Sequence, residues 1–219
     1  LLKHGIDINK NFTQVGTVLY IAAQYGHLNV VKLLLKNEGI NINQNTKHGF
    51  TPLHIAAQHG HLDVVKLLLQ NHIDINKTAD YGFTALHIAA QYGHLDVVKL
   101  LLQNHIDINQ KTKSGATALH IAAQHGHDKV VEVLLDNKLI LDNKLINVNQ
   151  KTNQGFTALH IAAQYGHDKV VEVLLDNKLI NVNQKTNQGF TALHIAAQHG
   201  HLDVVKLLLQ NHIDINKKA

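Results

Sequence analysis

The strongest constraint on the fold of this chain is internal repetition. The pattern Thr-x-Leu-x-Ile-Ala-Ala occurs six times, with its threonine at positions 17, 51, 84, 117, 157 and 191. The intervals between these threonines are 34, 33, 33, 40 and 34 residues. A chain with this period is expected to stack copies of one small unit, because a single unit cannot bury its own apolar surface.

Each unit is predicted to contain two helices. Thr51 is a favourable N-cap residue and Pro52 suits the first helical position, so a short helix is expected to begin there and to stop near Gly60. The second helix, over 62–69, is apolar around more than half of its circumference. Such a helix needs packing partners on several sides, and neighbouring units are expected to provide them.

The motifs in each unit also resemble a known family. Thr-Pro-Leu-His-Ile-Ala at 51–56, followed by Gly-His-Leu-Asp-Val-Val-Lys-Leu-Leu-Leu at 60–69, resembles the ankyrin repeat, and the similarity covers the whole chain. The resemblance implies an all-α solenoid of helix-turn-helix units with projecting hairpin loops. It also implies that partner proteins bind on the concave face formed by hairpins and inner helices, and it favours an intracellular, cytoplasmic location.

The repeats predict one ankyrin-like array over residues 1–219. The expected units are a partial repeat at 1–9 and signature-bearing repeats that start near 10, 44, 77, 110, 150 and 184. The chain begins and ends within a unit, so we expect a fragment of a longer array or of a larger protein. The sequence leaves its oligomeric state undetermined.

Two departures from the repeat pattern carry structural expectations. A tandem copy within 136–146 adds six residues, which are expected to lengthen the preceding helix or to form a bulge at its end. His72, His105 and His212 occupy positions where ankyrin repeats usually place a helix-ending glycine, and we expect positive φ angles there.

Composition excludes several classes of function. The chain has no cysteine, and all 20 of its basic residues are lysine, so a sequence-specific nucleic-acid reader that depends on arginine is not expected. No apolar run approaches the ~20 residues of a membrane span, and no basic-then-apolar leader pattern is visible.

The 19 histidines raise the question of a metal site. Eleven of them recur at two fixed positions of the unit, which favours a hydrogen bond that every unit needs. The polar residues form no nucleophile, base and orienting group of the kind that catalysis requires. We therefore expect no enzyme activity, no metal site and no cofactor.

Positions that vary between copies are the better functional candidates, because they are free of the stacking role. One set lies in the loops that precede the signature threonines, and the other lies at the ends of the first helices. The predicted partner-binding residues of the loop set are Lys47, His48, Phe50, Asp80, Tyr81, Phe83, Lys113, Ser114, Asn153, Gln154, Phe156, Asn187, Gln188 and Phe190. Those of the helix-end set are Tyr25, His59, Gln91, Tyr92, His125, Tyr165 and His199.

Eight of the ten aromatic residues fall within these two sets, which indicates a docking strip. Two alternatives stay open. Each phenylalanine before a signature threonine could instead pack against the neighbouring hairpin, and the alternation of tyrosine and histidine at the helix ends could reflect duplication of a two-repeat block.

The charge of the loops suggests a second property of the partner. Seven lysines and one aspartate lie in the loops before the signature threonines, which would attract an acidic partner surface. The alternative is that these lysines only keep the loop tips soluble. We predict a non-catalytic protein-protein interaction module; the alternative is a targeting or spacer segment of a larger enzyme, toxin or effector.

Overall fold

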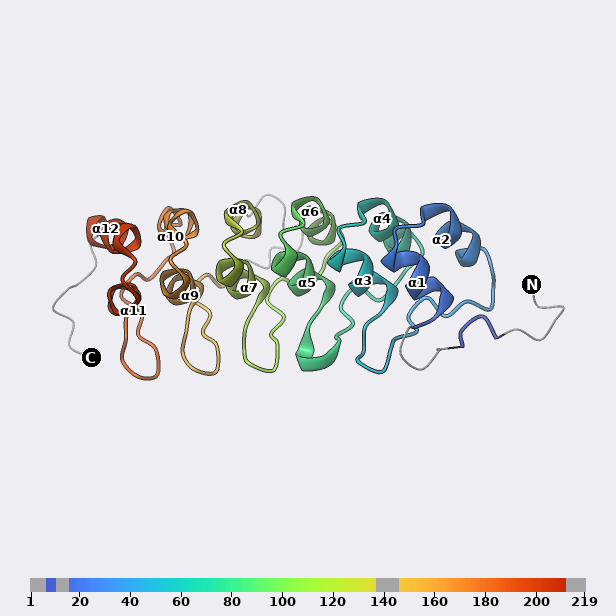
Figure 1. The fold of residues 1–219 in the computed structure, drawn as a ribbon, viewed down its shortest axis with the longest axis horizontal. Helices are drawn as coiled ribbons and strands as arrows, with labels where there is room; N and C mark the ends of the chain where they lie inside the picture. Colours follow the sequence, from blue (N-terminus) through green and yellow to red (C-terminus); the bar gives the residue numbers. More distant parts are fainter. Residues whose placement is uncertain (1–6, 11–15, 137–145, 212–219) are drawn as a thin grey trace. The chain divides into compact units, whose positions relative to one another are not determined.

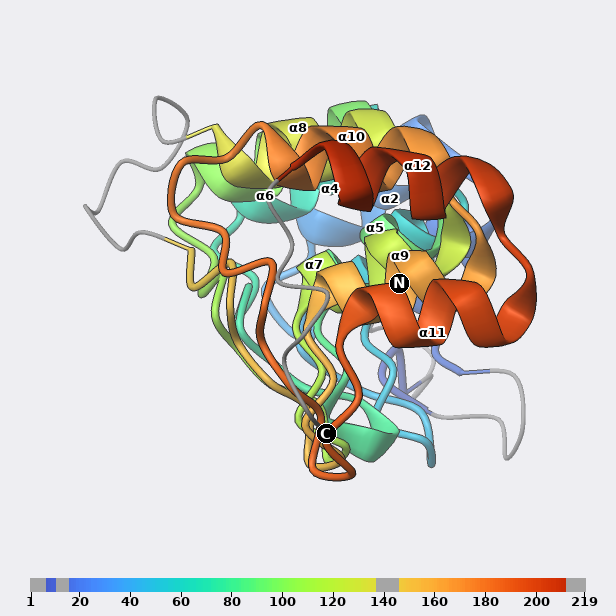
Figure 2. The same ribbon diagram turned by 90° about the vertical axis from the view of Figure 1, so that its left-hand side faces the viewer.

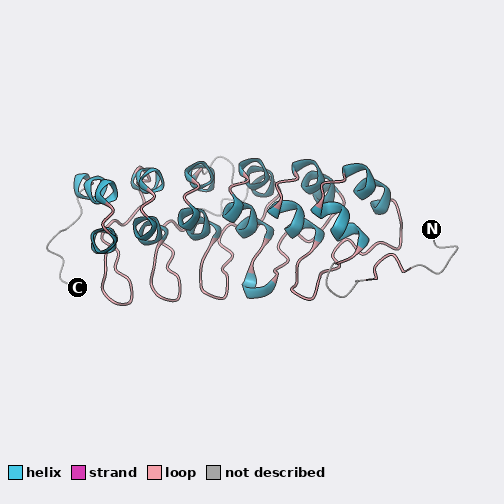
Figure 3. Ribbon diagram, in the orientation of Figure 1, coloured by secondary structure: helices cyan, strands magenta, loops and turns pink. Residues whose placement is uncertain are grey.

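The computed structural model describes residues 7–10, 16–136 and 146–211. The chain divides into two compact units, Leu1–Asp107 and Ile108–Ala219, and each is described by itself. Both are built from helices and loops, with no strand in the described ranges (Figure 3). The predicted all-α class is confirmed, whereas the single array over residues 1–219 stays a prediction.

The described part of each unit contains three helix pairs. In unit 1 these are α1 (Val18–Gln24) with α2 (Leu28–Leu35), α3 (Pro52–Gln58) with α4 (Leu62–Gln70), and α5 (Ala85–Tyr92) with α6 (Leu95–Gln103). In unit 2 they are α7 (Ala118–His125) with α8 (Asp128–Leu135), α9 (Ala158–Tyr165) with α10 (Asp168–Leu175), and α11 (Ala192–His199) with α12 (Leu202–Gln210). A short 3₁₀ helix, η2 (Asp80–Gly82), lies in a loop of unit 1.

Within each unit the pairs stack in two layers (Figure 1). The first helices of the pairs, here called the inner helices, pack on one another: α1, α3 and α5 in unit 1, and α7, α9 and α11 in unit 2. The second helices, here called the outer helices, form the other layer. The long loops between pairs extend away from the outer helices, past the inner ones (Figure 2). The inner helices and loops of each unit therefore share one side.

The core lies between these layers. Leu53, Ala56 and Ala57 are buried on α3, as expected, and the small alanines allow the inner helices to approach closely. On α4 the predicted apolar face is narrower than expected, because Leu67 and Leu69 are only half-buried. Val64, Val65 and Leu68 on the same helix are fully buried, so stacking removes most of its apolar surface from water.

The turn between the two helices of a pair fixes the spacing to the next pair. Gly166 ends α9 in the left-handed region, with φ of +71°, and a Cβ placed there would come within 2.5 Å of the His201 ring. That ring is held in place, because its Nε2–H donates to the carbonyl of Gln164 at 3.0 Å. His61, His94 and His167 make the same bond to the preceding repeat, to the carbonyls of Gln24, Gln58 and Gln124.

A second set of hydrogen bonds joins repeats at the other end of the helices. The Asn43 side-chain carbonyl accepts from the backbone N–H of Asp74, 31 residues later, at 2.8 Å. Asn149 bridges in the same way to Asn181 and also donates to the carbonyl of Leu179. The asparagine that follows each Asp-Ile, Asn-Ile or Asn-Val pair was not singled out from the sequence, although it recurs once per repeat.

Two expectations about irregular positions can be compared with the structure. His72 and His105 adopt φ angles of +61° and +62°, which confirms the prediction, whereas His212 lies outside the described residues. The helix before the six-residue insertion is not lengthened: α8 and α10 both have eight residues. Asp136 instead leaves the helix in an extended conformation, and residues 137–145 lie outside the described ranges.

The sequence predicts no membrane-spanning segment. Across the described ranges, no helix combines the length and apolar character that crossing a membrane requires.

Two glycines of unit 2 test the role of the turn. Gly166 and Gly200 have nearly equal φ angles, +71° and +73°, but a Cβ at Gly200 meets nothing within 4 Å. Gly200→Ala should cost about 1 kcal/mol of stability from backbone strain alone. Gly166→Ala should cost roughly 1–3 kcal/mol more, because its Cβ displaces the His201 ring. Urea unfolding followed by circular dichroism measures both losses.

Equal losses in the two variants would show that the His201 ring moves aside without cost. In that case the contact between the glycine turn and the next repeat would not set the spacing of the stack.

Candidate partner-binding groove

The signature histidine positions the candidate site. The Thr51 hydroxyl lies 2.7 Å from Nδ1 of His54, and the backbone N–H of Thr51 donates to the same nitrogen at 3.2 Å. This contact closes a capping box at the start of α3, with histidine in place of the usual Glu or Gln. The imidazole is therefore an acceptor at Nδ1 and a donor at Nε2.

The same ring holds the loop of the next repeat. Nε2–H of His54 donates to the carbonyl of Phe83 at 3.2 Å. Nε2–H of His120 lies 2.9 Å from the Gln150 carbonyl and 3.2 Å from that of Phe156. One buried side chain thus caps its own helix and fixes where the following loop presents its phenylalanine, which supports the hydrogen-bonding interpretation of the recurring histidines.

The phenylalanines have a packing role as well as an exposed edge. Phe50 and Phe83 each lie with their ring centroid 5.7 Å from that of the signature histidine in their own repeat. Both rings are half-buried. Each ring therefore packs on the histidine of its own repeat and is partly exposed.

The helix-end residues also stack on a histidine. Tyr92 lies parallel to His94, with centroids 6.3 Å apart, and His59 lies similarly against His61 at 5.8 Å. Tyrosine and histidine both supply the flat ring that this contact uses. Tyr25, Tyr92 and Tyr165 nevertheless leave 63%, 48% and 48% of their surface exposed.

Unit 1 contains a groove of about 380 Å³ between the repeats of α3 and α5. Seven predicted site residues line it: His48, Phe50, Asp80, Tyr81, Phe83, Gln91 and Tyr92. The other two lining residues, Gln58 and Ile88, were not in the predicted set. No signal in the sequence distinguishes Ile88, because the signature places an isoleucine at this position in every repeat.

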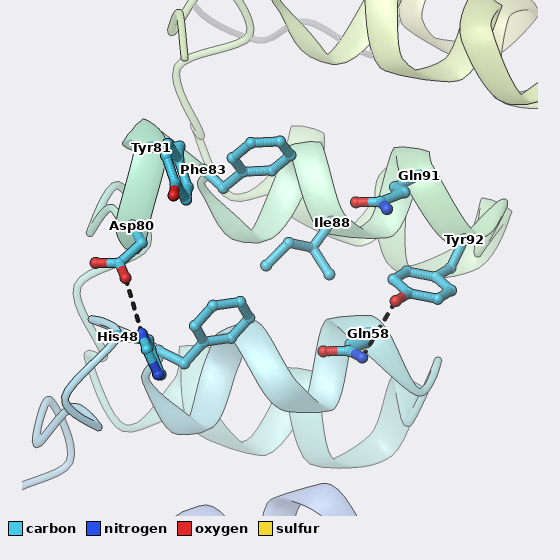
Figure 4. A pocket seen from close by; sticks show the side chains of 9 residues that line it. His48, Gln58, Asp80, Tyr81, Phe83, Ile88, Gln91 and Tyr92 are labelled. Atoms are coloured by element: carbon cyan, nitrogen blue, oxygen red, sulfur yellow. Dashed lines mark hydrogen bonds and ion pairs between the residues drawn. The ribbon is translucent and has the colours of Figure 1, made fainter. Parts of the chain in front are cut away.

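The groove has an apolar middle and polar ends (Figure 4). Phe83 and Ile88 lie in the middle, with His48 and Asp80 at one end and Gln58 and Tyr92 at the other. Nδ1 of His48 lies 2.9 Å from the Asp80 carboxylate, and Gln58 donates to the Tyr92 hydroxyl at 3.3 Å. These two contacts tie the walls of the groove together across the repeat boundary.

Tyr81 has an unusual backbone conformation. Its φ is +59°, a region that bulky residues rarely adopt, and 70% of its surface is exposed. The neighbouring loops place a residue of ordinary φ at this position and a glycine of positive φ after it. The residues before Gly82 do not predict that Tyr81 adopts a positive φ while the equivalent residues of the other loops do not.

The match to a family model decides the identity of this architecture. A model described as ankyrin repeats, in three copies, matches residues 1–79, 74–144 and 137–219. The chain belongs to the ankyrin-repeat family. No curated protein gives a significant match to it. Ankyrin repeats are in general protein-protein interaction modules, and the fold is typically a non-catalytic scaffold.

The remaining predicted site residues of this ankyrin-repeat chain do not line the groove. Lys47 is exposed in the same loop as His48, while Tyr25 and His59 lie at the ends of α1 and α3. Unit 2 carries the other predicted residues, in its loops and at the ends of its inner helices: Lys113, Ser114, His125, Asn153, Gln154, Phe156, Tyr165, Asn187, Gln188, Phe190 and His199.

Two of the unit 2 residues have a structural role. Asn153 Nδ2 donates to the carbonyl of Lys113, and Asn187 Nδ2 donates to that of Asn153, both at 2.9 Å. Their backbone N–H groups bond to Ser114 and Gln154 in the preceding loop. These asparagines therefore join adjacent loops of the ankyrin repeats.

The arrangement and burial of the histidines bear on metal binding and on protonation. Within the described ranges, no group of three or more His, Asp or Glu side chains is arranged to hold a metal ion. The pKa of His59 is lowered by burial and by the imidazoles of His61 and His94, which favours its neutral form. Burial also lowers the pKa of His54, His120 and His160 to about 4.

These three buried imidazoles predict loss of stability in acid. Their pKa in the unfolded chain is near 6.5, so below that pH unfolding takes up protons that the native state does not bind until about pH 4. Their contribution is complete above about pH 7 and falls as pH drops from 6.5 to 4, by roughly 3 kcal/mol for each group. Urea unfolding at a series of pH values measures it.

His54→Gln is the matched variant, because glutamine can keep the capping box and does not titrate. The stability of this variant should depend less steeply on pH between 6.5 and 4, by about one proton. An unchanged slope would show that His54 is not the titrating group.

Proposed function

We propose that this chain binds a partner protein through its inner-helix and loop side, with the groove of unit 1 at the centre of the interface. The observation that carries the proposal is the convergence of seven of the predicted partner-binding residues on one groove. These residues come from two adjacent repeats, so the groove exists only where repeats stack. The wider set of loop and helix-end residues in unit 2 belongs to the proposal as additional contact surface.

The chemistry of the groove suits a protein partner. Two half-buried phenylalanines and Ile88 offer apolar surface, and the exposed rings of Tyr81 and Tyr92 flank it. Tyrosines placed in this way are common at interface hot spots, because a rigid ring supplies a large contact area at little entropic cost. Its volume of about 380 Å³ has room for one bulky side chain of the partner, and polar groups lie at both ends of the groove.

The backbone of Tyr81 gives a second argument. A tyrosine at positive φ costs of order 1–3 kcal/mol, and residues strained in this way cluster at functional sites such as ligand clamps. The loops at 113–115 and 153–155 place glycine alone in this region and expose no aromatic ring at their tips. The strain is thus associated with the loop that lines the groove.

Quantitative affinity capture from lysates of cells that express the chain tests this proposal. The groove variant combines Tyr81→Asn, which tolerates positive φ, with Tyr92→Ala. Because each tyrosine at a hot spot contributes ~2 kcal/mol, the recovery of specific partners should fall at least about tenfold. Circular dichroism should show that the variant stays folded, since both side chains are exposed.

The matched control is Leu33→Ala with Leu202→Ala. These leucines are 64% and 62% exposed on outer helices, so the control removes comparable apolar surface from the other layer. Its recovery should equal that of the unmodified chain. Equal recovery by the groove variant, or an equal loss in the control, would contradict a partner-binding groove and favour a spacer role.

A further inference from the structure

The charge of the groove differs from the charge of the loops that surround it. Among the nine lining residues, Asp80 is the one acidic side chain, and no lysine is present. The loop lysines of unit 1, such as Lys47, lie outside the lining. The groove itself therefore offers a negative charge, although the loops as a whole are basic.

The Asp80 carboxylate is open to a second partner. Its Oδ2 lies 2.9 Å from Nδ1 of His48, and the side chains of Asp80 and His48 are 50% and 59% exposed. A planar cation can therefore reach the carboxylate from solvent, through Oδ1, without displacing His48.

Tyr81 follows Asp80 in the chain, and both residues line this end of the groove (Figure 4). A guanidinium group can interact with both Asp80 and Tyr81, because it donates hydrogen bonds to carboxylate oxygens in its plane and stacks its face on aromatic rings. An ammonium group would satisfy the carboxylate but would gain less from the ring. The end of the groove at Asp80 thus favours arginine over lysine.

The middle of the groove favours a bulky apolar side chain. Ile88 is 3% exposed and forms the floor, with the half-buried rings of Phe50 and Phe83 beside it. An aliphatic or aromatic side chain placed there would cover the outward surface of both rings. The polar end at Gln58 and Tyr92 would then face the partner's main chain.

We propose that the groove binds a segment of a partner protein in which an arginine lies next to a bulky apolar residue. The arginine pairs with Asp80 and stacks on Tyr81, and the apolar residue fills the space over Ile88. This inference rests on the proposed function and specifies the partner chemistry of the same site.

Unit 2 shows how the loop is built without this charge. Asn187 occupies the position of Asp80, and its amide donates to the carbonyl of Asn153 in the preceding loop. Asp80→Asn therefore converts the loop to a form that the chain already uses. The variant should fold normally, because the introduced amide can make the same bond to the loop before it.

Phage display of random twelve-residue peptides on the folded full chain identifies the preferred segment. Selected peptides should be enriched in arginine beside leucine, isoleucine, phenylalanine or tryptophan. Synthetic peptides are then measured by fluorescence polarisation against the unmodified chain, against Asp80→Asn, and against the control Asp203→Asn. Asp203 is an exposed carboxylate on α12, 3.0 Å from Lys206, and lies in the other unit.

Asp80→Asn should weaken binding about tenfold, and Asp203→Asn should leave it unchanged. Replacing the peptide arginine by glutamine should weaken binding to the unmodified chain but have little further effect on Asp80→Asn, because the two changes remove one interaction. The groove variant, Tyr81→Asn with Tyr92→Ala, should no longer bind the same peptides.

Three results would overturn the inference. They are the selection of acidic or neutral peptides, unchanged affinity of the Asp80→Asn variant, and affinity losses that add when the peptide arginine and Asp80 are both replaced. Peptides whose binding depends on Tyr81 and Tyr92 but not on Asp80 would support the groove as the binding site and would contradict the proposed pairing of a partner arginine with Asp80. Failure to select any peptide that depends on the groove would count against both proposals.

Discussion

The structure depends on one buried imidazole that serves two neighbours. His54 accepts from its own Thr51 at Nδ1 and donates from Nε2 to the loop of the next repeat. A carboxylate could close the same capping box but could not donate to the carbonyl beyond it, and an unpaired charge would be costly at a site that is 1% exposed. A neutral ring with one donor and one acceptor satisfies both sides.

The groove is a consequence of this linkage. Because His54 holds the carbonyl of Phe83, the phenylalanine of one loop is fixed opposite that of the loop before it. The turn histidines act at the other end of the inner helices, where His94 bonds back to Gln58 and supports the ring of Tyr92. Variable side chains are thus carried on a frame in which each repeat positions the next, as expected for preorganised binding.

The sequence was a good guide to some residues and a poor guide to others. Repetition and helix chemistry predicted α3 from Thr51 to near Gly60, the buried alanines, and the positive φ of His72. They also predicted seven of the nine groove residues, six of which lie at positions that differ between copies, whereas Gln91 is the same in all six repeats. They did not predict Ile88 as a floor, since the signature repeats it in every unit and so gives it no distinguishing feature. Nor did they reveal that the phenylalanines pack on histidines.

The sequence by itself determined the family, the all-α repeat architecture and the positions at which variable residues gather, because these follow from period, capping residues and local propensity. Only the tertiary structure decided which variable residues meet. It placed Asp80 and Tyr81 in the lining of the groove and the lysines outside it, and it joined His48 to Asp80 across a repeat boundary. Such contacts depend on the spacing between repeats and on the direction of each side chain, which no single repeat encodes in its own sequence.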